Sequence, residues 1–87
     1  MKLYLISQKE NNNYETYDSA VVCAESEEQA RNVNPDKWKF GEDTEFMNWS
    51  KREYSWCSSP DKVTVEYIGE AKEGSTVGVV LSSFNAG

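Results

Sequence analysis

Apolar and polar residues alternate in four short stretches of the chain, and this period of two predicts four β-strands. Residues 2–7 form the first stretch, in which apolar side chains fall on both faces, as is typical of a strand inside a sheet. Residues 16–24 form the second stretch, separated from the first by a polar turn. We therefore expect the first two strands to pair as a hairpin.

The last third of the chain repeats this arrangement. The third stretch begins after Pro60, and the fourth spans about residues 76–84. The polar residues 69–75 between them contain two glycines and predict a turn, so we expect a second hairpin. The alternation places three apolar side chains of the fourth stretch on one face: Val77, Val79 and Leu81. Together the strands favour one four-stranded, mainly antiparallel sheet.

A short helix is predicted between the two hairpins. Residues Ser26 to Gln29 form a capping box, in which the Ser26 hydroxyl accepts from the Gln29 N–H and the Gln29 side chain reaches back to the Ser26 N–H. The helix is expected to end just before Pro35, which disfavours helical backbone at the preceding residue. It has about two turns and must be stabilised by packing Ala30 and Val33 onto the sheet.

Residues 36–59 differ in composition from the rest of the chain. They contain no Val, Leu, Ile or Ala but six large aromatic residues: Trp38, Phe40, Phe46, Trp49, Tyr54 and Trp56. Cations are interleaved with the rings in Lys37–Phe40 and in Lys51–Trp56. Residues 44–52 can form a short helix, or the segment can cross one face of the sheet as a loop.

Two interpretations of this aromatic segment stay open. Its rings can cover the core of a domain that is short of aliphatic residues, or they can form a binding surface for a protein or a nucleotide. In the second case the rings stack on bases and Arg52 contacts a phosphate. The candidate binding residues are Trp38, Phe40, Trp49, Arg52, Tyr54 and Trp56.

The chain length of 87 residues is that of one domain, residues 1–87. The expected class is α+β, with the order strand, strand, helix, aromatic segment, strand, strand. A net charge of −6 repels phosphates, so we expect no DNA or RNA binding and a protein partner with a basic surface. Two acidic clusters would also suit a protein that imitates a phosphate surface: Glu25, Glu27 and Glu28, and Glu42, Asp43 and Glu45. We also expect no membrane span and no signal peptide.

Two cysteines and no histidine leave little equipment for catalysis. Cys23 lies in an apolar strand and is expected to be buried, whereas Cys57 lies in a loop and is expected to be more exposed. A nucleophilic cysteine needs a base, and two distant cysteines alone make a poor zinc site. We therefore expect a reduced, cytoplasmic protein that is not an enzyme and that has no metal or cofactor.

Four segments resemble small accessory proteins encoded by bacteriophages and prophages: Met1–Ser7, Tyr17–Arg31, Val65–Ala71 and Ser82–Gly87. The resemblance covers most of the chain but assigns no functional residue. It implies an accessory protein that acts in the cytoplasm of the bacterial host, where such proteins counter host defences by binding a defence protein or its nucleotide signal.

The expected function is therefore that of a non-enzymatic binding module, which inhibits or modulates a host defence protein by direct contact. Small size, negative charge and the aromatic segment favour it. The alternative is a homo-oligomeric sponge that sequesters a small nucleotide ligand, a second messenger, on the aromatic segment.

Overall fold

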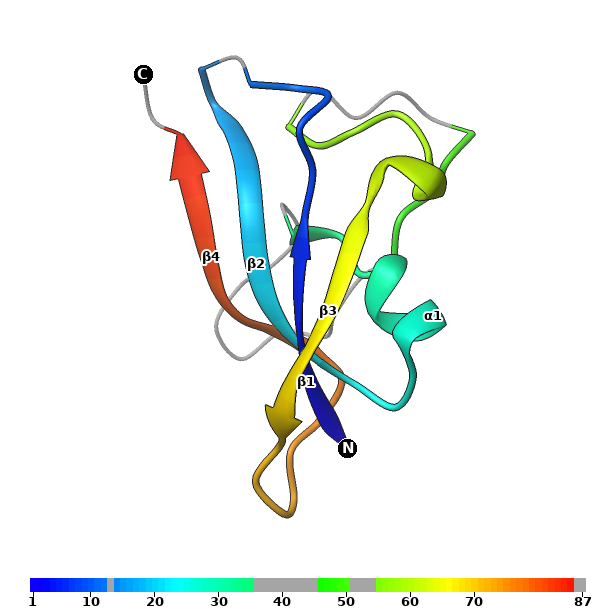
Figure 1. The fold of residues 1–87 in the computed structure, drawn as a ribbon, viewed down its shortest axis with the longest axis vertical. Helices are drawn as coiled ribbons and strands as arrows, with labels where there is room; N and C mark the ends of the chain where they lie inside the picture. Colours follow the sequence, from blue (N-terminus) through cyan, green and yellow to red (C-terminus); the bar gives the residue numbers. More distant parts are fainter. Residues whose placement is uncertain (13, 36–45, 51–54, 86–87) are drawn as a thin grey trace.

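The computed structural model describes residues 1–12, 14–35, 46–50 and 55–85, which form a four-stranded antiparallel sheet with one short helix (Figure 1). The elements are β1 (Lys2–Ser7), β2 (Thr16–Ala24), α1 (Glu27–Arg31), the 3-10 turn η2 (Pro60–Lys62), β3 (Thr64–Glu70) and β4 (Gly78–Asn85). The mixed α+β class and the antiparallel sheet are thus confirmed, and the domain is mostly sheet. The helix predicted over residues 44–52 is not seen in residues 46–50, which form a bridge and a turn, and the remainder of that range lies outside the described residues.

The strands lie in the order β3-β1-β2-β4. The interior position predicted for β1 is confirmed, because β1 pairs antiparallel with β2 along one edge and with β3 along the other. The second hairpin was wrong: β3 and β4 lie at opposite edges of the sheet. Residues 71–77 lead from the end of β3 past the ends of β1 and β2 to β4 (Figure 1). Alternation of side chains specifies the faces of a strand but not its neighbours, so the pattern could not exclude this crossing.

One face of the sheet packs against α1 and forms the core. Tyr4 and Ile6 of β1 and Val22 of β2 are buried there, and so are Ala30 and Val33, as predicted. The helix contacts β1, β2 and β3. The side chains that alternate with Tyr4 and Ile6 must point to the opposite face of the sheet.

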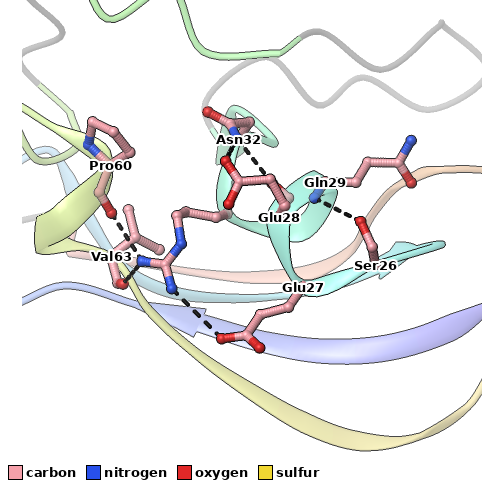
Figure 2. A network of polar contacts seen from close by, with 8 residues as sticks. Ser26, Glu27, Glu28, Gln29, Asn32, Pro60 and Val63 are labelled. Atoms are coloured by element: carbon pink, nitrogen blue, oxygen red, sulfur yellow. Dashed lines mark hydrogen bonds and ion pairs between the residues drawn. The ribbon is translucent and has the colours of Figure 1, made fainter.

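The predicted cap of α1 is present with one change (Figure 2). The Gln29 N–H donates to the Ser26 hydroxyl at 3.1 Å, but the Gln29 side chain accepts from the N–H of Glu25 at 2.7 Å rather than from that of Ser26. The helix also ends at Arg31, earlier than predicted. Asn32 caps it, with a side-chain N–H that donates to the Glu28 carbonyl at 2.8 Å.

Arg31 joins the helix to the segment that enters β3 (Figure 2). Its guanidinium donates to the backbone carbonyl oxygens of Pro60, at 2.9 Å, and of Val63. It also lies 3.6 Å from the exposed carboxylate of Glu27, one turn earlier in the helix. These two hydrogen bonds from one side chain therefore connect α1 to residues 60–63.

We predict that Arg31→Met lowers the free energy of unfolding by about 2–3 kcal/mol, because two charged hydrogen bonds are lost and the Val63 carbonyl loses the guanidinium donor, whereas the Pro60 carbonyl keeps the Val63 N–H. Methionine keeps the apolar stem and the helix propensity. The control Glu27→Gln removes the ion pair and one negative charge from the first turn of the helix, and it should cost at most about 1 kcal/mol. Urea unfolding followed by circular dichroism measures both values, and equal losses for the two variants would contradict the assignment.

Candidate binding surface

The structure describes two of the six aromatic-segment residues predicted to bind, Trp49 and Trp56. Trp38, Phe40, Arg52 and Tyr54 lie outside the described residues. The prediction that all six form one binding site therefore stays a prediction, and the two described rings are considered separately.

Trp56 lies in the core, with 1% of its surface exposed. Three hydrogen bonds tie its segment to the start of β2 and to the turn before it. The Tyr17 N–H donates to the Ser55 carbonyl at 2.8 Å, the Asn11 side chain donates to the Trp56 carbonyl at 3.2 Å, and the Ser58 N–H donates to the Glu10 carboxylate at 2.8 Å. Hydrogen bonds from Ser58 lower the pKa of Glu10. Of the two interpretations of the segment, this ring fits core cover.

Trp49 is half-buried and packs against the core. Its indole N–H donates to the Asn32 side-chain oxygen at 2.7 Å, and the backbone N–H of Met47 donates to the Asn32 carbonyl at 2.7 Å. The residue that caps α1 therefore also holds the segment 47–49. Trp49 thus has an identified structural role, and part of its ring remains exposed.

A groove lies on the face of the sheet opposite the core, with a volume of about 220 Å³. The described residues that line it come from β1, β2 and β4: Leu5, Ser19, Ala20, Val21, Leu81, Ser82 and Ser83. Its apolar part is a cross-strand row, because Leu5 pairs in register with Val21, and Val21 with Leu81. We call Leu5, Val21 and Leu81 the apolar row. Leu81 is 68% exposed.

Polar side chains border the apolar row. Two residues away on each strand, the next row on this face carries a hydroxyl on every strand, in the order Thr64, Ser7, Ser19 and Ser83. Beyond Leu5, the apolar row ends at the exposed carboxylate of Glu66 on β3. Three strand spacings separate Leu81 from Glu66, about 14 Å. The surface therefore offers an apolar contact, hydroxyl groups and one negative charge in a fixed geometry.

Sequence reasoning missed this surface because of one bulge. The register between β2 and β4 shifts between Val21, opposite Leu81, and Val22, opposite Val79. Val80 is the extra residue, so Val79 is buried in the core while Leu81 lines the groove. The prediction that Val79 and Leu81 share one face was therefore wrong. That prediction assumed regular alternation along β4, which the bulge at Val80 interrupts.

Cys57 is buried, contrary to the predicted exposure, and Cys23 is buried as predicted. Burial raises the pKa of the Cys57 thiol to about 11. A thiol that stays protonated at neutral pH is a weak nucleophile. Within the described part of the chain, no group of His, Cys, Asp or Glu side chains is arranged to hold a metal ion, and no helix is long and apolar enough to cross a membrane.

Comparisons with known proteins identify no family for this chain. No family model matches it, and no curated protein or solved structure does. The resemblance to phage accessory proteins accordingly stays a prediction, and function must be argued from the surface itself.

We predict that Cys57, isolated in a Cys23→Ala variant, reacts with an aromatic disulfide reagent at least about 100-fold more slowly in the folded protein than in urea at about pH 8. The pKa difference alone, from 9.0 to about 11, accounts for this factor. The folded state favours the neutral thiol because its pKa is raised. The contribution of Cys57 to stability is therefore complete below pH 9 and is lost as the pH rises through 11. Equal rates in the folded and unfolded states would contradict the burial.

Proposed function

We propose that the protein is a non-enzymatic binding module that inhibits or modulates a host protein by direct contact, and that the apolar row is the centre of the contact surface. The observation that carries this proposal is the in-register apolar row that lines a groove, in which Leu81 is 68% exposed and Leu5 and Val21 are half-buried. Contiguous exposed apolar groups rimmed by polar side chains are typical of protein-interaction sites. The resemblance to phage proteins supports a bacterial partner, in the cytoplasm.

The charge of the chain supports a basic partner. The net charge of −6 attracts cationic surfaces at long range and speeds their association. At short range, Glu66 places a carboxylate at the end of the apolar row. A partner segment that lies across the strands would put aliphatic side chains on Leu81 and Val21. It would put a lysine or arginine at Glu66, about 14 Å from Leu81.

Leu81→Lys should abolish partner binding, because it places a desolvated charge on the apolar row. Val80→Lys is the matched control, because it adds the same charge to the preceding residue of β4. Val80 is 55% exposed and is not among the described residues that line the groove. Both variants and the native protein are immobilised, and bacterial lysate is passed over each. We expect a protein that the native chain and Val80→Lys retain and that Leu81→Lys retains at least about tenfold less, a loss of about 1.4 kcal/mol.

The proposal fails if the same proteins are retained by Leu81→Lys and by the native chain, or if the native chain retains none. Circular dichroism of each variant shows that the sheet is intact. This excludes unfolding as the reason for lost capture.

Glu66→Gln should slow association with the captured partner more than Glu73→Gln does. Both changes raise the net charge from −6 to −5, so their long-range effect is equal. Only Glu66 lies at the end of the apolar row, whereas Glu73 lies in the turn after β3. Surface plasmon resonance at low and high salt measures the rates. If the two variants behave alike, the partner's cation does not contact Glu66.

A further inference from the structure

Strand β4 forms one edge of the sheet, and it pairs on its inner side with β2. Among the described strands, none pairs with its outer edge. Such an edge presents backbone N–H and C=O groups that can pair with another strand. Three large apolar side chains of β4 are also exposed: Val80 at 55%, Leu81 at 68% and Phe84 at 46%.

The sequence of β4 lacks two of the features that usually protect an edge, although a bulge interrupts the strand at Val80. Its residues GVVLSSFN contain no charge and no proline, in a chain of which 28% is charged. At that frequency, eight residues would carry about two charges. The opposite edge, β3, carries Glu66 and Glu70. The two edges therefore differ in the property that decides whether a strand can approach.

We propose that β4 pairs antiparallel with β4 of a second copy of this chain, which joins two sheets into one of eight strands. The bulge at Val80 interrupts the regular strand, so the segment available for pairing is residues 81–85. Its centre is Ser83. A two-fold axis there places Ser83 opposite the second copy's Ser83, as an isologous interface requires.

The neutral charge of β4 selects a second copy over a basic partner. A cationic strand attracted by the charge of −6 finds no carboxylate along β4, whereas a second copy brings an equally neutral strand of the same length. β4 itself carries no carboxylate, and on the neighbouring strand β2 the exposed Asp18 lies between the residues that pair with Ser83 and Phe84. Pairing also brings Leu81 and Phe84 next to the second copy's strand, which reduces their exposure to water.

The pairing has a consequence for the groove. Residues directly opposite each other in an antiparallel pair point to the same face, so the two grooves would open on the same side of the eight-stranded sheet. Leu81 and the second copy's Leu81 would be offset by four residues, about 13 Å along the strands. The dimer would thus be bivalent toward a partner with two sites.

The test uses charge exchange at Ser83. In Ser83→Lys, two like charges face each other across the axis, and the same holds for Ser83→Glu, so each variant should be monomeric. An equimolar mixture of the two should form dimers, because lysine then faces glutamate. Thr64→Lys is the matched control, because Thr64 lies at the other end of the hydroxyl row, on the β3 edge, and this variant should stay dimeric.

Sedimentation velocity measures the mass, 9.9 kDa for a monomer and twice that for a dimer. We expect the native chain to dimerise more strongly as salt rises, since salt screens the repulsion between two chains of charge −6. A native chain that is monomeric at every concentration overturns the proposal, and so do Ser83→Lys and Ser83→Glu variants that both remain dimeric. Monomeric variants whose mixture does not dimerise overturn the two-fold register. None of these outcomes depends on the proposed partner, which is tested separately by capture.

Discussion

Strand β1 supports the whole sheet, because its six residues pair with a neighbour along both edges. Its apolar residues point alternately to the two faces. Tyr4 and Ile6 enter the core beneath α1, while Leu5 supports the apolar row on the opposite face. Among the described residues, α1 and the segments beside it pack on one face of the sheet, and the apolar row lies on the other. An apolar surface outside the core therefore follows from the strand that makes the core possible.

Because the core is thin, hydrogen bonds from side chains to the backbone hold the connections in place. Arg31 joins α1 to the segment before β3, and Asn32 joins the same helix to residues 47–49. Gln8 is nearly fully buried in the turn after β1, where its amide donates to the Asn11 and Tyr17 carbonyls. Each of these residues satisfies groups in segments that have little regular structure of their own. Apolar burial and these polar ties together fix the position of the strands on which the groove depends.

Local chemistry determined what could be predicted from the sequence. The Ser26 cap and the interior position of β1 depend on neighbouring residues and on the period of side chains, so both were predicted correctly. The partner of β3 depends on which edge of β1 is left free by β2, a property of the assembled sheet. The groove depends on the bulge at Val80, for which the sequence of β4 contains no glycine or other signal at that position. The burial of Cys57 follows from the fixing of residues 55–58 to a distant turn, and it too is invisible in a local pattern.

An uncharged edge strand is a liability for a protein in solution unless something limits what can pair with it. In this chain, the negative charge of the remaining surface limits which molecules can pair with the edge strand. At −6, two copies repel each other in most orientations, and only contacts with many backbone hydrogen bonds and little intervening charge can overcome that repulsion. The edge along β4 satisfies both conditions, and the β3 edge with its two glutamates does not. The same negative field attracts basic surfaces, and at the groove it is presented by Glu66 at the end of the apolar row. Charge and strand order together therefore separate two surfaces on one small sheet, a neutral edge suited to its own copy and an apolar face with a carboxylate suited to a basic partner.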